Sequence, residues 1–179
     1  ISFVISGFFF SKFTKRDFDQ VFIYEVSPMT QALPGVWYAK RKKIKCSIYV
    51  MDLWPESIEL ATGIHNQKVL HLVGKMVDYI YKKCDNIIAS SKSFIKEIEK
   101  RGHSKEKISF WPQYAEEFYK PVLQENCQDI EIKQDDFFHI IFAGNIGQAQ
   151  GLDVLIDTAK ILKEKNLKVK IFLVGNGRA

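Results

Sequence analysis

Short, continuously apolar runs alternate with amphipathic stretches along this chain, and this alternation limits its possible folds more than any other feature. Runs in which nearly every residue is apolar are typical of strands in a parallel sheet covered on both faces. A helix between two such strands makes them parallel, with a right-handed crossover. The sequence therefore predicts an α/β fold. The expected strands are 21–26, 46–51, 86–89, 107–111, 138–143 and 169–174.

Helices are expected between these strands, because the intervening stretches have a period near 3.6 residues and carry start and stop signals. Ser and Thr cap helix starts, Pro suits the first helical residue, and Gly ends helices. The expected helices are 30–43 (despite Pro34 and Gly35), one that starts at Pro55, 67–83, one capped by Ser90 or Ser91 and ended by Gly102, and 151–165.

An acidic, amide-rich stretch without periodicity interrupts the pattern, and it predicts two separate parallel sheets. The charge balance changes at the same place: residues 1–120 carry 19 Lys and Arg against 13 Asp and Glu, whereas residues 121–179 carry 7 against 8. We expect a first domain at 1–120, a linker at 121–136 and a second domain at 137–179. The chain has no initial Met and stops as a strand reaches its turn, so we also expect a fragment of a longer protein.

Composition excludes several classes of protein. Hydrophobic residues make up 46% and charged residues 26%, which argues against disorder. The apolar run 1–10 is about half the length of a spanning helix and lacks the basic leader of a signal peptide. The cysteines (Cys46, Cys84, Cys127) form no CxxC pair and the histidines have no ligand spacing. We therefore expect no disulfide framework, no metal site, and a reduced, cytoplasmic location.

Ligands of open parallel sheets bind at the carboxyl ends of strands, and a glycine-bearing loop occupies one such end at 144–151. Gly144 and Gly147 would let the backbone approach a ligand, and the start of the next helix favours a phosphate. The same glycines could serve only to make a tight turn. Their spacing is not G-x-G-x-x-G, so a dinucleotide site is weakly supported.

Two other segments also follow strands. Ser27-Pro28 ends the first strand, and Asp52-Leu53-Trp54-Pro55-Glu56-Ser57 ends the second. A carboxylate such as Asp52 or Glu56 can orient or deprotonate a hydroxyl, and Trp54 could stack on a sugar ring. The alternative interpretation is that these residues only begin the helix and pack beside it.

A basic cluster from Lys40 to Lys45 precedes the second strand. Such a cluster is ordinarily a solvated surface. Because Trp37 and Tyr38 lie beside it, the leading alternative is contact with an anionic membrane through Arg41, Lys42 and Lys43. We expect no nucleic-acid partner, because the sequence has no helix-turn-helix, zinc-finger or RNA-binding signature.

Five separated segments together resemble family 4 glycosyltransferases, in a bacterial branch that builds surface polysaccharides such as O-antigen or capsule and includes fucosamine-type transferases. Segments 141–156 and 174–177 resemble the start of the family's C-terminal domain, and segments 52–57, 90–94 and 111–116 resemble parts of its N-terminal domain. The resemblance implies a GT-B fold of two Rossmann-like domains. It also implies retaining, metal-independent transfer from a nucleotide sugar, with UDP favoured, to a lipid-linked or saccharide acceptor.

The resemblance implies that a diphosphate leaving group is held by Gly144, Asn145, Gly147 and Gln150, with the helix starting near Gln150. Many relatives carry Arg and Lys at the positions of Asn145 and Gln150, so a cation from elsewhere would have to supply the counter-charge. No cofactor is expected beyond the nucleotide-sugar substrate.

In the other half of the chain, the resemblance makes Asp52 the expected catalytic residue, with Trp54 and Glu56 in contact with the acceptor or the sugar. The family's paired glutamates do not occur in this sequence, so we expect no turnover by this chain alone. The implied location is cytoplasmic, peripheral on the inner face of the plasma membrane. The competing hypotheses are a nicotinamide-dependent enzyme that modifies nucleotide sugars and a non-catalytic Rossmann-like binding module.

Overall fold

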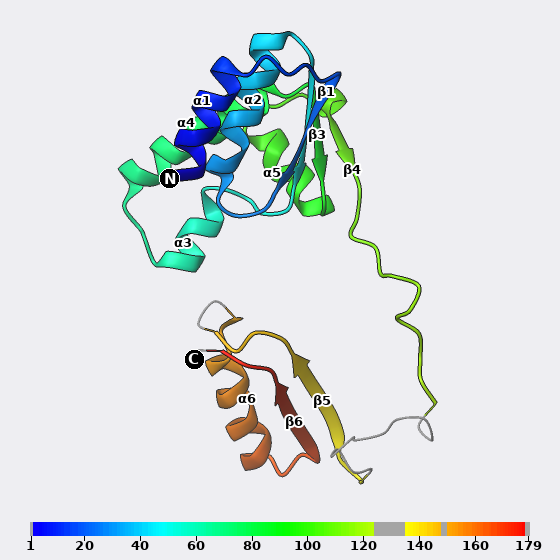
Figure 1. Cartoon of the computed structure of the whole chain (residues 1–179). Helices are drawn as coiled ribbons and strands as arrows, with labels where there is room; N and C mark the ends of the chain where they lie inside the picture. Colours follow the sequence, from blue (N-terminus) through cyan, green and yellow to red (C-terminus); the bar gives the residue numbers. More distant parts are fainter. Residues whose placement is uncertain (1, 124–134, 148–149, 178–179) are drawn as a thin grey trace. The chain divides into compact units, whose positions relative to one another are not determined.

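The computed structural model describes residues 2–123, 135–147 and 150–177, with the backbone alone for residues 60–62 (Figure 1). The chain forms two compact units, residues 1–115 and residues 116–179. The expected linker at 121–136 lies for the most part outside the described residues, and so do Cys127, Gln148 and Ala149.

The first unit contains a four-stranded, fully parallel sheet in the order β1-β2-β3-β4. Its register places one isoleucine from each strand in a row, Ile23, Ile48, Ile87 and Ile108. The first three of these are buried in the core. The strands are β1 (Gln20–Glu25), β2 (Lys45–Val50), β3 (Asn86–Ala89) and β4 (Ile108–Phe110).

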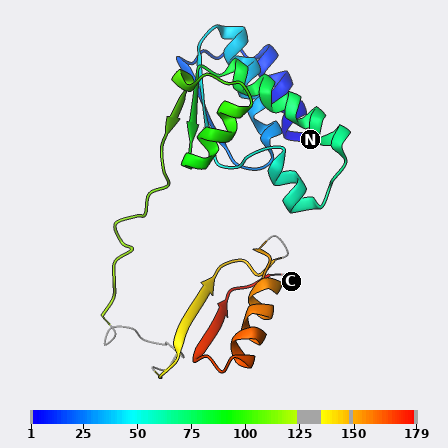
Figure 2. The same ribbon diagram turned by 180° about the vertical axis from the view of Figure 1, so that it is seen from behind.

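Helices pack against one face of this sheet, as Figures 1 and 2 show from opposite sides. Because successive strands are neighbours in one direction, right-handed crossovers place all the connecting helices on the same face. Val36, Val77 and Ile98, from three different helices, accordingly share one buried core with the sheet. The helices are α1 (Ser2–Phe13), a 3₁₀ turn η1 (Met29–Gln31), α2 (Ala32–Lys42), α3 (Glu56–Thr62), α4 (Gln67–Lys83), α5 (Lys92–Lys100) and a 3₁₀ turn η2 (Lys105–Lys107).

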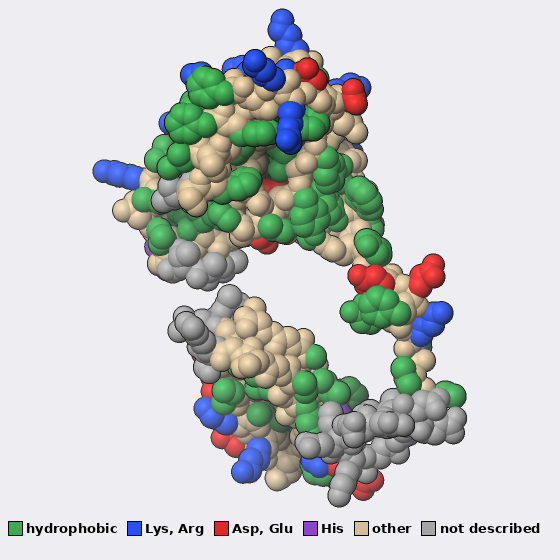
Figure 3. Space-filling model, in the orientation of Figure 1, with side chains coloured by type: hydrophobic (Ala, Val, Ile, Leu, Met, Phe, Trp, Pro, Cys, Tyr) green, Lys and Arg blue, Asp and Glu red, His purple; other side chains and the backbone are tan. Residues whose placement is uncertain are grey.

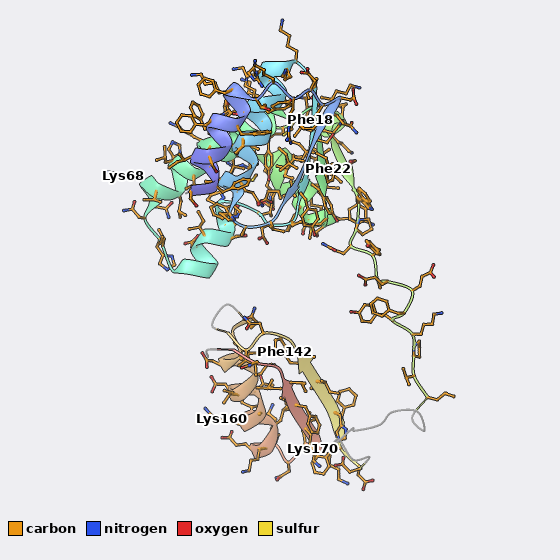
Figure 4. The ribbon with its side chains drawn as sticks, viewed as in Figure 1. Phe18, Phe22, Lys68, Phe142, Lys160 and Lys170 are labelled. Carbon is orange, nitrogen blue, oxygen red and sulfur yellow. The ribbon has the colours of Figure 1, made fainter. Side chains whose placement is uncertain are left out.

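The opposite face of the sheet carries aromatic side chains, and no described helix covers it. Phe22, labelled in Figure 4, and Tyr24 are about half exposed there. The rings of Tyr24 and Tyr49 are 5.7 Å apart, and those of Tyr49 and Trp111 are 5.6 Å apart. We expected a sheet covered on both faces, and for the described residues this was wrong. Apolar strands show neither which face of a sheet the helices cover nor how many helices there are.

Most elements of the first unit confirm the sequence predictions, including α4 and β3 with the expected bounds. Ser91 rather than Ser90 caps α5, since its hydroxyl accepts a hydrogen bond from the amide of Ser93. The helix expected at 30–43 instead begins as the turn η1, and α2 starts at Ala32. Helix α1 was missed, because its apolar residues lie all around the helix and give no clear periodicity.

The second unit is the predicted βαβ unit. β5 (Phe138–Ala143) and β6 (Val169–Val174) pair in parallel, and α6 (Asp153–Glu164) connects them. The two separate parallel sheets that the sequence predicted are therefore confirmed. Each unit has the Rossmann-like pattern of a parallel sheet with helical crossovers. Of the helices that the structure describes, none has both the length and the hydrophobicity to cross a membrane.

Candidate functional site

The carboxyl ends of β1 and β2 bring Ser27, Asp52 and Trp54 together. The two strands pair in register up to Glu25 and Val50, so the segments that follow them emerge side by side. The hydroxyl of Ser27 donates a hydrogen bond to Oδ2 of Asp52 at 2.6 Å, and Nε1 of Trp54 donates to Oγ of Ser27 at 3.2 Å. These three side chains form one hydrogen-bonded cluster, which we call the carboxyl-edge cluster.

Two prolines shape the loops that carry this cluster. The peptide bonds Ser27-Pro28 and Trp54-Pro55 are both cis. Pro55 occupies the N-cap position of α3 and Glu56 lies in the first turn, close to the expected helix start. Asp52 and Trp54 are partly buried, whereas Ser27 and Glu56 are exposed. A ligand in solvent could therefore reach the carboxyl-edge cluster.

A buried carboxyl lies at the end of β1, next to the cluster. The side chain of Glu25 is fully buried, and neither of its oxygens accepts a hydrogen bond of ordinary geometry from the described residues, although the backbone amides of Met51 and Asp52 lie close to it. Burial raises the pKa of Glu25 from 4.5 to about 8; the backbone amide of Asp52 opposes this rise and the carboxylate of Asp52 adds to it. At pH 7 this carboxyl is therefore protonated while it is folded into the core.

The sequence analysis did not identify Glu25 as a buried carboxyl beside the cluster. A signal was present, because Glu25 is the one charged residue in the otherwise apolar run Val21–Val26. Charged residues are rarely buried without a partner, so such a residue in a core strand is a candidate for a functional role. Ser27 was recognised only as part of a segment at a strand end, and its contact with Asp52 needed the register of β1 and β2.

A cavity of about 460 Å³ lies next to the cluster, between α3, α4 and the end of α5. Arg101 is held in it by a hydrogen bond from Nε to Oδ1 of Asp78 at 2.9 Å and by one from Nη2 to the carbonyl oxygen of Gly74 at 2.8 Å. The wall carries both carboxylates and cations, so its charge is mixed. The lining residues are Pro55, Glu56, Glu59, Gln67, Leu70, His71, Gly74, Lys75, Asp78 and Arg101.

In the second unit, two of the backbone amides expected to bind an anion are already engaged. The amide of Gly144 donates to the carbonyl oxygen of Val174 at 2.9 Å, and the amide of Ile146 donates to that of Asn176 at 3.0 Å. These bonds extend the β5–β6 pairing past the ends of both strands. Close approach requires glycine here, since a Cβ on Gly175 would lie 1.8 Å from the carbonyl oxygen of Gly144.

The side chains of Asn145 and Gln150 converge on Gly147. A Cβ built on Gly147 would lie 2.9 Å from Nδ2 of Asn145 and 3.0 Å from Oε1 of Gln150. The structure thus brings together the four residues predicted to hold a diphosphate, and Gly144, Asn145 and Gln150 are exposed. The donors that this loop leaves for a ligand therefore differ from the expected ones, because they are amide side chains and the amides not used in the strand pairing.

The start of α6 differs from the prediction. The helix was expected to begin near Gln150, but it begins at Asp153, with Leu152 as N-cap and no side-chain cap. The amide of Gln150 instead closes a turn onto the carbonyl oxygen of Gly147 at 3.0 Å. The carboxylate of Asp153 lies in the first turn and itself satisfies the positive end of the helix dipole. A second anion at this helix start would meet that negative charge.

The predicted membrane-facing residues have unequal environments. Lys42 forms an ion pair with Asp17, which neutralises its charge locally. Arg41 donates to the carbonyl oxygen of Thr14 at 2.9 Å, an uncharged partner. Lys43 ends α2 in the left-handed conformation and is exposed. Of these three residues, only Lys42 forms an ion pair within the part of the chain that the structure describes.

No three His, Cys, Asp or Glu side chains of the described residues come close enough together to hold a metal ion. The buried thiols of Cys46 and Cys84 lie 3.9 Å apart and are not bonded to each other. Comparison with protein families and with curated proteins finds no match to this chain.

Proposed function

We propose that this chain is part of a retaining glycosyltransferase of GT-B type that moves a sugar from a nucleotide sugar, with UDP favoured, to a saccharide or lipid-linked acceptor. The observation that carries the proposal is the carboxyl-edge cluster of Ser27, Asp52 and Trp54 at the end of a parallel sheet. Ligands of such sheets bind at this edge. A carboxylate, a hydroxyl and an indole are groups that bind the hydroxyls and the apolar face of a sugar.

The neighbouring cavity supports a neutral, polar ligand. Its wall carries Glu56, Glu59 and Asp78 together with Lys75 and Arg101, so an ion of either sign would meet like charges. A sugar has hydroxyls that donate to carboxylates and accept from cations, and it carries no net charge. At about 460 Å³ the cavity falls within the ordinary range for small-molecule sites.

In this proposal Asp52 accepts a hydrogen bond from a sugar hydroxyl and orients it for reaction. Ser27 already donates to Oδ2 of this carboxylate, which fixes its orientation. Glu25, protonated beside it, keeps a second negative charge away from Asp52 at neutral pH. Asn145, Gly147 and Gln150 would contact the diphosphate by hydrogen bonds, and the counter-charge must come from another residue.

Tryptophan resonances allow a direct test of the sugar site. The chain has three tryptophans, so its ¹⁵N spectrum contains three indole signals. We expect N-acetylglucosamine and UDP-N-acetylglucosamine to shift the Trp54 signal and to leave Trp37 unchanged. Asp52→Asn should weaken this binding about tenfold, the loss of one hydrogen bond to a charged group. Asp19→Asn, an exposed carboxylate before β1, serves as the matched control.

The same titration discriminates the competing functions. UDP should shift the backbone amide of Gly147, and NAD should not. If NAD shifts that amide and UDP does not, a nicotinamide-dependent enzyme replaces the transferase. If neither nucleotide nor sugar changes any signal, the chain is a binding module without a sugar site, and the proposal fails.

A further inference from the structure

Two cysteine side chains meet inside the first unit. Cys46 lies on β2, and Cys84 follows the last turn of α4 as its C-cap, so they come from different elements. Their sulfur atoms are 3.9 Å apart, and each residue is 1% exposed. At this distance one thiol donates a weak hydrogen bond to the other. We call these two residues the thiol pair.

Hydrogen bonds hold the thiol pair in place from both sides. The amide of Cys46 donates to Oδ2 of Asp85 at 2.8 Å, and the amide of Asp85 donates to the carbonyl oxygen of Cys46 at 2.8 Å. The amide of Cys84 donates to the carbonyl oxygen of Ile80 at 3.1 Å, and Nζ of Lys107 donates to that of Cys84 at 3.3 Å. The sulfur atoms must approach by about 2 Å to bond, and these contacts keep the two residues beside each other while they do so.

The thiol pair lies close to the surface at the end of the sheet where the strands begin. Lys45, Lys83 and Asp85, which adjoin the two cysteines along the chain, are exposed. Figure 3 shows Lys and Arg side chains gathered at this end of the first unit, at the top of the view. Nearby cations favour the thiolate, which is the reactive form of cysteine.

The two thiols differ in reactivity. The hydrogen bond from Cys84 lowers the pKa of the Cys46 thiol, and burial and the Asp85 carboxylate only partly offset this effect. The same hydrogen bond, together with burial, raises the pKa of Cys84. Cys46 is therefore the thiol that reacts first, and Cys84 is placed to react with its product.

We propose that the thiol pair is a redox-sensitive latch, which hydrogen peroxide closes as a disulfide between Cys46 and Cys84 and which small thiols reopen. Hydrogen peroxide is small and uncharged, so it suits sulfur atoms that are buried just below the surface. The wide spacing of the cysteines in the sequence hides this pair, because it is formed by the packing of α4 on β2.

The chemistry takes two steps. The Cys46 thiolate attacks one oxygen of the peroxide, the O–O bond breaks, and Cys46 becomes a sulfenic acid; the departing hydroxide takes up a proton and forms water. The Cys84 thiolate then attacks the sulfur of Cys46 and the S–O bond breaks, so a second hydroxide leaves as water. Two thiols and one peroxide thus give one disulfide and two waters.

The closed latch would form a covalent ring of residues 46–84. This ring contains Asp52 and Trp54 of the carboxyl-edge cluster, and also α3 and α4, which line the cavity. A cross-link over such a stretch restricts the unfolded chain and lowers its equilibrium population about thirtyfold or more. An effect of the latch on sugar binding rests on the proposed function, whereas the latch itself does not.

Peptide mapping of the full chain after mild peroxide treatment tests the latch. Remaining thiols are blocked with iodoacetamide, and the protein is digested with trypsin, which cuts after Lys45 and Lys83 and places the two cysteines in peptides 46–68 and 84–92. We expect these peptides to be joined by a disulfide and to separate in dithiothreitol. Tryptophan fluorescence before digestion should show that the first unit stays folded.

Urea unfolding measures the effect on stability. Closing the latch should raise the urea midpoint of the first unit by about 1 M, and dithiothreitol should return it to the original value. Cys84→Ala should show neither the cross-link nor the shift, whereas the matched control Cys127→Ala should show both. The mapping needs no variant, so it decides the matter even where Cys84→Ala folds poorly.

Four results would overturn the proposal. In the first, peptides 46–68 and 84–92 stay separate and carry blocked thiols. In the second, either peptide is joined to the one that contains Cys127. In the third, the cross-link forms only in protein already unfolded in urea. In the fourth, the cross-linked protein unfolds at the same urea concentration as the reduced protein or at a lower one.

Discussion

The buried carboxyl of Glu25 should make the first unit less stable as the pH rises, and Glu25→Gln should remove this dependence. Burial raises the folded-state pKa of Glu25 to about 8, and the ordinary value is 4.5. Between these values the side chain is protonated in the folded protein and ionised in the unfolded chain. Unfolding then releases a proton, so a higher pH favours the unfolded state.

The size of the effect follows from the two pKa values. Each pH unit between them lowers the free energy of unfolding by about 1.4 kcal/mol. The interval from 4.5 to about 8 therefore corresponds to a loss on the order of 4 to 5 kcal/mol. This loss begins above the unfolded pKa, grows steadily and is complete near pH 8. Below pH 4.5 the carboxyl is protonated in both states and contributes no pH dependence.

Urea unfolding at pH 5, 6, 7 and 8 measures this loss. All three tryptophans lie in residues 1–115, so tryptophan fluorescence reports the first unit alone. Glu25→Gln, neutral at every pH, should match the wild type within about 1 kcal/mol at pH 5 and exceed it by several kcal/mol at pH 8. Glu117→Gln, the same change at an exposed position, should follow the wild type. Parallel pH curves for the wild type and Glu25→Gln would refute the reasoning.

Two further predictions concern backbone contacts. Gly175→Ala should disrupt the strand extension at the end of β5, because its Cβ would overlap a carbonyl oxygen. Hydrogen exchange of the Ile146 amide should then become at least tenfold faster. The control Gly144→Ala, whose Cβ would meet only a side chain at 3.5 Å, should change this exchange rate little. Arg101→Met should lower unfolding free energy by about 1 to 2 kcal/mol in urea, since it loses bonds to Asp78 and to a backbone carbonyl. Lys100→Met, which removes an exposed ion pair, should cost less than about 0.5 kcal/mol.

The strands and most helices could be predicted from the sequence, because their signals are local. The stripe in Gln67–Lys83 has the period of a helix, and the short run Asn86–Ala89 has the length and β-rich composition of a buried strand. Helix α1 could not be predicted in this way. Its run of phenylalanines is apolar on every side, and it is fixed by the fit of Gly7 on Pro34, a contact between two elements.

The candidate site shows the same division. That Asp52 and the glycines of 144–151 follow strands was evident from the sequence, and the carboxyl edge of a parallel sheet followed from it. The contact of Ser27 with Asp52 depends on the pairing of β1 with β2, which residue types do not reveal. The hydrogen bond from the Gly144 amide to the carbonyl oxygen of Val174 likewise depends on how far the pairing of β5 with β6 continues.

The sequence by itself determined most elements of this protein, their order and the parallel direction of both sheets, because periodicity and crossover length act over short stretches of chain. The tertiary structure alone decided which side chains are buried, which amides remain unbonded and which charges are paired. Burial gives Glu25 its raised pKa, and packing brings the thiols of Cys46 and Cys84 within 3.9 Å of each other. These properties depend on neighbours far away in the sequence, and no local pattern records them.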